Sequence, residues 1–205
     1  MLQSINPEHP EPRKIQRAVQ ILQDGGVIAY PTDTVYGLGC DPLNKQAIDR
    51  LYQIKGMPRT KPLAFICKDL ANIARYAIVE NPEYRVLKHF LPGPYCFVLR
   101  ATREVPRMLT NKQKTVGIRV PDHPVTRALV EELGRPLLST TACLPDEEAI
   151  ADPWTIDATF PSLDLVLEAD VCGVTPTTVV DLSEGDVRVI REGAGPIAEL
   201  VQNHR

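Results

Sequence analysis

The chain has 205 residues, a net charge of −3 and an isoelectric point near 5.8. Because a chain of this length can bury about 70% of its unfolded surface without disulfides or metals, we expect one domain. That domain would span residues 1–205, with its core over about residues 12–200. The acidic balance excludes a basic field over the whole protein, so any contact with RNA would need a local basic patch.

The five cysteines are widely spaced, odd in number and without any C-x-x-C pair. This pattern predicts reduced thiols in a cytoplasmic protein, and it argues against a disulfide framework or a zinc site. The stretch 1–13 is polar and contains prolines, unlike a signal peptide, and no apolar run approaches membrane-spanning length. We therefore expect no membrane partner, while the oligomeric state stays open.

Hydrophobic periodicity predicts helices and strands that alternate along the chain, which indicates an α/β fold. In the helix over 82–90 we expect Tyr84, Leu87 and His89 near the core. The acidic stretch 145–152 is irregular and could form a lid. The expected helices lie at about 12–24, 47–55, from 69, at 82–90, from 124 and around 154; the expected strands lie at 27–30, 63–67, 95–100, 115–120, 136–143, 165–168, 176–181 and 187–194.

The segment 27–41 changes from a buried strand into a polar loop. Pro31 ends the strand because proline has no N–H to donate. The residues that follow include two threonines, an aspartate and a tyrosine, and their polarity predicts a loop that cannot bury itself. Such a loop can hold a small polar ligand, although a strand exit with turn-forming Thr and Asp has the same composition.

Two further features could bind anions. Lys55, Arg59 and Lys61 fall within one seven-residue stretch that forms a Gly- and Pro-containing turn. Such a cluster of cations suits phosphate, but it also fits a solvated helix end. Arg119 interrupts the apolar strand 115–120, which is costly unless the arginine is paired or meets an anion. The alternative is an arginine on an edge strand, paired at the surface. The strand 136–143 ends in hydroxyls, which fit either an anion site or an ordinary Ser/Thr turn.

Residues 31–38 read Pro-Thr-Asp-Thr-Val-Tyr-Gly-Leu, which resembles the signature of the YrdC-like family, the L-threonylcarbamoyl-AMP synthases. Matches continue in family order through Lys55-Gly56, Pro92-Gly93-Pro94, the segment 115–124 and the last two strands, so the resemblance covers nearly the whole chain. It implies a single-domain, twisted, open mixed sheet flanked by helices, the YrdC/RibB type of fold, with a deep polar cavity on one face.

The resemblance also implies roles for individual residues. Lys55 and Arg119 would be catalytic, Arg119 would bind the carboxylate of threonine, and Thr115 and Arg191 would contact the nucleotide. No protein metal site is implied. The implied substrate-binding residues are Thr32, Thr34, Tyr36, Arg119, Ser139 and Thr177, and the implied nucleotide-binding residues are Lys55, Arg59, Lys61, Thr115, Thr141, Cys143 and Arg191.

The chain departs from the synthase pattern at four positions. Met57 stands where the family has a nucleotide-contacting arginine, and Lys61 where it often has asparagine. Ile66 stands in place of a histidine, and Cys143 in place of an asparagine whose amide can both donate and accept. These departures are typical of the YciO branch of the family.

Three hypotheses follow. The first is a nucleotidyltransferase that joins L-threonine, bicarbonate and ATP, carried with Mg²⁺, into threonylcarbamoyl-AMP for the threonylcarbamoyladenosine modification of tRNA. The second is a YciO-type protein that binds tRNA or double-stranded RNA and has weak or altered nucleotidyl transfer. The third is an adenylating enzyme with another amine substrate, since Ile66 alters the threonine side of the implied site.

Overall fold

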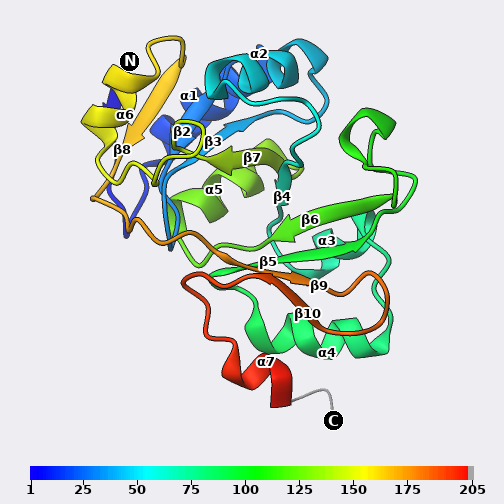
Figure 1. Ribbon diagram of the computed structural model, residues 1–205. Helices are drawn as coiled ribbons and strands as arrows, with labels where there is room; N and C mark the ends of the chain where they lie inside the picture. Colours follow the sequence, from blue (N-terminus) through cyan, green and yellow to red (C-terminus); the bar gives the residue numbers. More distant parts are fainter. Residues whose placement is uncertain (203–205) are drawn as a thin grey trace.

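The computed structural model describes residues 1–202, and within them ten strands form one mixed sheet (Figure 1). The strand order is β1-β8-β2-β3-β7-β4-β6-β5-β9-β10. The strands are β1 (Leu2–Ser4), β2 (Ile28–Tyr30), β3 (Gly37–Cys40), β4 (Ala64–Ile66), β5 (Tyr95–Arg100), β6 (Thr115–Arg119), β7 (Leu137–Thr141), β8 (Leu165–Glu168), β9 (Thr178–Asp181) and β10 (Arg188–Arg191). The predicted open mixed α/β fold is confirmed.

Helices flank this sheet on both sides, as the sequence periodicity indicates. The helices are α1 (Pro12–Gln23), α2 (Lys45–Lys55), α3 (Leu70–Tyr76), α4 (Asn81–Phe90), α5 (Pro124–Leu133), α6 (Pro153–Thr159) and α7 (Ala198–Gln202). A short 3₁₀ turn covers Arg107–Leu109.

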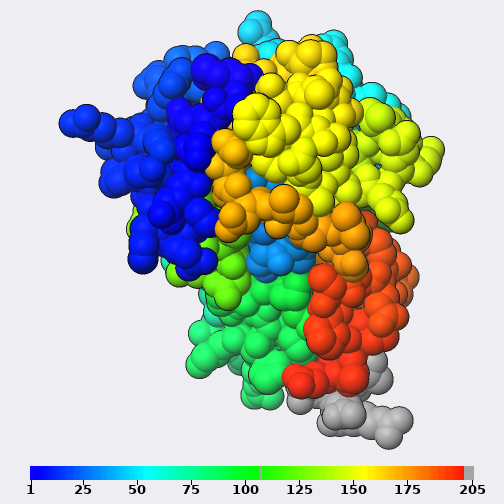
Figure 2. Space-filling view, turned by 90° about the vertical axis from the view of Figure 1, so that its left-hand side faces the viewer, coloured from blue at the N-terminus to red at the C-terminus, as the bar shows by residue number. Residues whose placement is uncertain are grey.

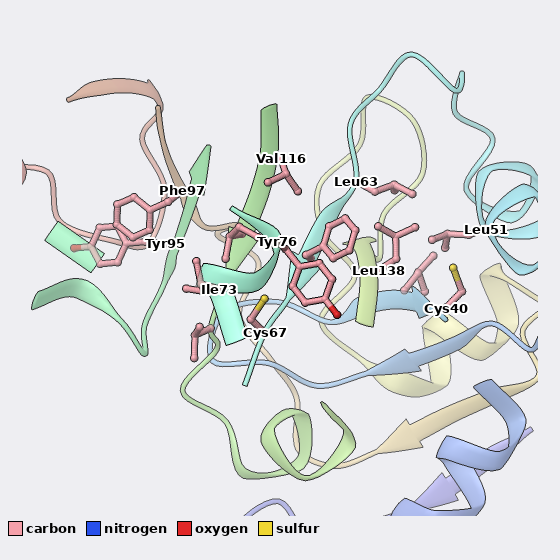
Figure 3. Packing of buried hydrophobic residues seen from close by; sticks show 14 of the residues in the cluster. Cys40, Leu51, Leu63, Cys67, Ile73, Tyr76, Tyr95, Phe97, Val116 and Leu138 are labelled. Carbon is pink, nitrogen blue, oxygen red and sulfur yellow. The ribbon is translucent and has the colours of Figure 1, made fainter. Parts of the chain in front are cut away.

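One face of the sheet, which we call the core face, carries large apolar side chains. Phe65 of β4 is in register with Ile118 of β6 and with Leu138 of β7, so the three side chains lie on the same side. Phe97 of β5 joins them through its pairing with Ile118. Figure 3 shows this cluster running from Tyr95 and Phe97 through Ile73 and Tyr76 to Leu138, Leu51 and Cys40.

The opposite face, which we call the site face, carries small or polar side chains at the centre of the sheet. In the same register, Ala64 lies beside Gly117 and Ser139. Thr115 and Arg119 flank Gly117 along β6 and share its side. Helices α1 and α5 cover only the part of this face near β2, with a separate apolar cluster that includes Leu22, Leu129, Ile28, Leu137 and Ile66.

Helix α2 begins and ends with well-defined caps that place Lys55. The Asn44 side chain accepts a hydrogen bond from the backbone N–H of Ala47 at 3.0 Å, as its position before the helix predicts. Gly56 ends the helix in the left-handed conformation with φ of 63°, which glycine adopts without strain. Lys55 therefore lies in the last turn, immediately before the chain reverses.

Three expectations about local structure are wrong, those for the segment after Pro31, for Tyr84 and for His89, and the strands β1 and β3 were not predicted. The segment after Pro31 is buried, and its end forms β3, because glycine-rich Gly37–Cys40 fits between β2 and β7 against Tyr30. β1 pairs with β8 although the N-terminal stretch shows no strand pattern. Tyr84 and His89 are exposed on α4, whereas Leu87 is buried as expected. Tyr84 and His89 were expected near the core in error, because the amphipathic ten-residue helix α4 buries only one face.

Candidate functional site

Arg119 gathers the loop that follows β2. Its guanidinium donates to the Thr34 hydroxyl at 2.8 Å and to the Thr32 hydroxyl at 3.1 Å, and it also pairs with the Asp33 carboxylate. Arg119 is 7% exposed and lies on β6 between β4 and β5, so the edge-strand alternative is wrong. A buried cation with three oxygen partners from one loop is strongly held, because a charge out of water needs paired, hydrogen-bonded neighbours.

The loop over residues 31–36, which we call the threonine loop, is fixed from within and from helix α5. The Thr32 hydroxyl donates to the Val35 carbonyl at 2.6 Å and accepts from the backbone N–H groups of Thr34 and Val35. From α5, the Thr126 hydroxyl donates to the Pro31 carbonyl at 2.6 Å. These bonds satisfy the buried backbone of a segment that lacks a strand partner, and they hold its polar side chains over the site face.

The segment over residues 169–177, which we call the crossing segment, runs between β8 and β9 and packs on the threonine loop. The Tyr36 hydroxyl donates to the Asp170 carbonyl at 3.1 Å. The Tyr36 hydroxyl oxygen also accepts from the backbone N–H of Ala169 at 3.2 Å. A Cβ on Gly173 would lie only 2.8 Å from the Thr34 carbonyl, so a side chain there would force the two segments apart. Figure 2 shows light blue atoms, from about residues 30–40, in a recess beneath the orange segment.

Lys55 and Cys143 form a second polar group. The Lys55 ammonium is buried and donates to the backbone carbonyl of Cys143 and, at 2.7 Å, to its sulfur. Among residues 1–202 we find no carboxylate within ion-pair distance of Lys55. A buried ammonium without a counter-ion is suited to an anionic ligand.

Two more candidate pairs lie on the site face. Arg191 of β10 donates to the Thr177 carbonyl at 2.9 and 3.2 Å and to its hydroxyl at 3.3 Å. Arg191 is exposed on β10, an edge strand that pairs with β9 in an antiparallel arrangement. At the start of β6, the Thr115 hydroxyl accepts from the Asn111 amide at 2.7 Å.

The cations near Met57, Arg59 and Lys61, lie apart from the Lys55–Cys143 group. Met57 is partly buried against the apolar core. Arg59 pairs with Asp49 on α2, and Lys61 is exposed. Neither cation contacts the Lys55–Cys143 group through a described hydrogen bond or ion pair.

The other predicted residues take supporting positions. Ser139 hydrogen-bonds the Tyr30 hydroxyl at 2.5 Å, and burial raises the pKa of that tyrosine to about 12, so it stays protonated. Thr141 ends β7 opposite Gly37 and is partly exposed. Ile66 is the register neighbour of Arg119, but its side chain is buried in the apolar cluster beneath α1 and α5. At this position β4 therefore carries an apolar side chain, where the family resemblance implies a histidine.

Two free thiols near the site, Cys96 and Cys172, are not activated. Burial raises the pKa of Cys96 to about 11, and it raises the pKa of Cys172 as well. The Cys172 sulfur donates to the Thr32 carbonyl at 3.5 Å, so it supports the threonine loop. Both thiols are thus in their protonated form near neutral pH.

Residues 1–202 contain no cluster of three or more His, Cys, Asp or Glu side chains that could hold a metal ion. The groups that could bind an anionic substrate are the cations described above. A cavity of about 360 Å³ lies elsewhere, between Lys68–Leu70, Leu91–Pro92, Val120 and Arg127. A deep polar cavity on the site face remains a prediction.

In the part of the chain that the structure describes, no helix has the length and apolar character needed to cross a bilayer.

Sequence reasoning missed three contributors, Asp33, Asn111 and Cys172. Asp33 stands inside the recognised motif, and its place between Thr32 and Thr34, two implied substrate-binding residues, was the available signal. Asn111 and Cys172 lie in irregular segments without periodicity, so their contacts depend on the tertiary fold alone.

Comparisons with known proteins agree with this architecture. The family model Sua5_yciO_yrdC, described as telomere recombination, matches residues 20–193. The crystal structure of Escherichia coli YciO superposes with a TM-score of 0.93 and 40% identity, covering 97% of this chain and 98% of that one. A threonylcarbamoyl-AMP synthase of Hydrogenovibrio crunogenus is 36% identical over 165 residues, covering 78% of this chain and 88% of the relative.

The crystal structure of Pyrococcus abyssi Sua5 complexed with L-threonine superposes with a TM-score of 0.92 and 26% identity. The match covers 99% of this chain but only 60% of the larger protein. The family model matches most of the sequence, and the relatives include both YciO and threonylcarbamoyl-AMP synthases. The chain therefore belongs to the Sua5/YciO/YrdC family.

Proposed function

We propose that the chain is a nucleotidyltransferase of the threonylcarbamoyl-AMP synthase type, which joins L-threonine, bicarbonate and ATP and releases pyrophosphate. The observation that carries the proposal is the buried Arg119, held by Thr32 and Thr34 on a sheet face of small residues. A fixed guanidinium suits the carboxylate of an amino acid, because its planar donors match the two oxygens. The kinship with threonylcarbamoyl-AMP synthases supports this choice of substrate.

In the proposed reaction, the amine of threonine attacks bicarbonate to form a carbamate and water. A carbamate oxygen then attacks the α-phosphorus of ATP in line, and pyrophosphate leaves. No protein nucleophile is required, since this chemistry depends on positioning and on stabilising charge. Arg119 would hold the carboxylate, Lys55 and Arg191 would neutralise phosphate, and magnesium would arrive with ATP.

The direct test is pyrophosphate release from ATP and bicarbonate, measured with and without L-threonine. We expect release that depends on threonine. Arg119→Lys should lower it at least about 100-fold, because an ammonium cannot reproduce the guanidinium fork. Arg127→Lys is the matched control, since Arg127 is exposed and pairs only with Asp122 among the described ion pairs of residues 1–202. Equal release by both variants would contradict the assignment of Arg119.

One observation favours a different amine as a second candidate. Ile66 places an apolar side chain next to Arg119 in the sheet register, where the family resemblance implies a histidine. The same assay with each common amino acid in place of threonine separates the candidates. Release with an apolar amino acid, and none with threonine, would favour the changed substrate.

The RNA-binding hypothesis is decided by the same preparation. If no amino acid supports release, binding of tRNA and of double-stranded RNA should be measured at two salt concentrations, since phosphate contacts weaken steeply with salt. Salt-sensitive binding without turnover would replace the synthase proposal. The net charge of −3 argues against strong binding of this kind.

A further inference from the structure

The ion pair between Arg119 and Asp33 is incompletely satisfied. Among the described residues, four buried side-chain polar atoms lack a hydrogen-bond partner, and two of them are Asp33 Oδ2 and Arg119 Nε. One unmet acceptor and one unmet donor thus belong to the two members of the same pair. Because buried polar groups are almost always satisfied, such atoms call for an explanation.

The surroundings do not supply the missing partners. The Thr32 and Thr34 hydroxyls are engaged with Arg119 through its terminal Nη2 nitrogen, which also serves Asp33 Oδ1. The Asp33 and Arg119 side chains are 12% and 9% exposed, so bulk water reaches little of either. A ligand that brings one donor and one acceptor would satisfy both atoms.

The charges define the ligand further. Asp33 Oδ2 is anionic and calls for a donor, while Arg119 Nε is cationic and calls for an acceptor. A small molecule with an ammonium next to a carboxylate meets both requirements, and an α-amino acid is the simplest such zwitterion. We propose that Asp33 binds the amine of the amino-acid substrate while Arg119 binds its carboxylate, which makes Asp33 the residue that selects amino acids over hydroxy acids.

This inference rests on the proposed function and agrees with its chemistry. When the ammonium reacts with bicarbonate, the products are a carbamate, one water and one released proton, so the nitrogen passes from three N–H bonds to one. The remaining N–H can still donate to Asp33 Oδ2. The same carboxylate therefore orients the nitrogen both before and after carbamate formation.

The test combines a protein variant with a ligand variant. Isothermal titration measures binding of L-threonine and of 3-hydroxybutanoate, which lacks only the amine, to the wild type and to Asp33→Asn. We expect the wild type to bind threonine at least about tenfold more tightly than 3-hydroxybutanoate, the loss typical of a hydrogen bond to a charged group. Asp33→Asn should weaken threonine binding by a similar factor and leave 3-hydroxybutanoate binding unchanged or stronger.

Asp122→Asn is the matched control, because Asp122 is also an aspartate paired with an arginine but is exposed. It should bind both ligands as the wild type does. Equal binding of the two ligands by the wild type would overturn the role of Asp33, even if Asp33→Asn failed to fold. So would undiminished threonine binding by a folded Asp33→Asn variant.

The two proposals fail in different ways. If threonine binds but no pyrophosphate is released, the proposed reaction is wrong and the binding data alone judge Asp33. If pyrophosphate is released but removal of the amine or of the Asp33 charge changes no affinity, the reaction stands and the role of Asp33 is wrong. A wild type that binds no amino acid overturns both.

Discussion

The two faces of the sheet differ in what their side chains contribute. On the core face, consecutive strands present Phe65, Ile118, Leu138 and Phe97, which close-pack into one apolar cluster. At the centre of the site face, the same strands present small or polar residues such as Ala64, Gly117 and Ser139, and a loop and a crossing segment lie over this face. Because neighbouring residues of one strand serve opposite faces, stability and binding can be changed separately within a few residues.

The largest difference should appear in stability when adjacent residues of β5 are compared. Phe97→Ala should lower the free energy of unfolding by about 3–5 kcal/mol, because Phe97 is fully buried and stacks on Tyr95. Cys96→Ala, one residue earlier on the site face, should cost less than about 1 kcal/mol. Urea unfolding followed by circular dichroism measures both. Equal losses would mean that the site face is as closely packed as the core face.

The second comparison concerns catalysis at Lys55. If the buried Lys55 neutralises phosphate as proposed, Lys55→Ala should reduce threonine-dependent pyrophosphate release at least about 100-fold, because water cannot replace a buried cation. Lys45→Ala removes an exposed lysine at the other end of the same helix and serves as the control. If the Lys55 variant retained the activity of the control, Lys55 would leave the list of candidate catalytic residues.

Periodicity in the sequence was sufficient for the core face, because buried side chains follow strand and helix spacing. The helix at Lys45–Lys55 and the strand at Tyr95–Arg100, whose buried side chains belong to the core face, match their predictions closely. The site face was harder to predict. The strand Gly37–Cys40 has two glycines and little pattern of its own, and its burial comes from the neighbours that enclose it.

The candidate site was predicted only in part, because most of its contacts join segments that are distant in the sequence. Arg119 was identifiable because a charge within an apolar strand demands a partner. Its actual partners, Thr32, Asp33 and Thr34, lie more than 80 residues away along the chain. The contact of Lys55 with Cys143 likewise depends on how α2 packs on β3, the neighbour of β7 in the sheet, which no local pattern encodes.

A smaller effect is expected at Cys143, whose sulfur accepts from Lys55 at 2.7 Å. Cys143→Asn introduces an amide, which accepts more strongly than a sulfur and can also donate. If the site is that of a synthase, this substitution should raise pyrophosphate release by up to about tenfold, the effect of one hydrogen bond. Cys143→Ala is the control and should not raise the rate. A rise in the alanine variant alone would show that the thiol obstructs the site.

The smallest effect concerns His123, which lies just beyond Arg119 and begins the helix that covers part of the site face. Its Nδ1 accepts from the backbone N–H of Val125 at 3.2 Å, so the ring must be neutral on that side to cap the helix. Burial lowers the pKa of His123 below 6.5, although the nearby Asp33, Glu8, Asp122 and Asp170 carboxylates oppose this shift. The folded protein therefore holds the neutral form more strongly than the unfolded chain does.

As the pH falls through 6.5, the unfolded chain takes up the proton first, so the stability that His123 contributes is lost toward acid. His123→Asn keeps a capping acceptor without a titrating ring and should remove this part of the pH dependence. Between neutral and mildly acidic pH, the wild type should lose about 1 kcal/mol more unfolding free energy than the variant, the usual contribution of a cap. Identical pH profiles in urea unfolding would show that the His123 ring does not titrate with folding, and that the helix over the site face is insensitive to its charge.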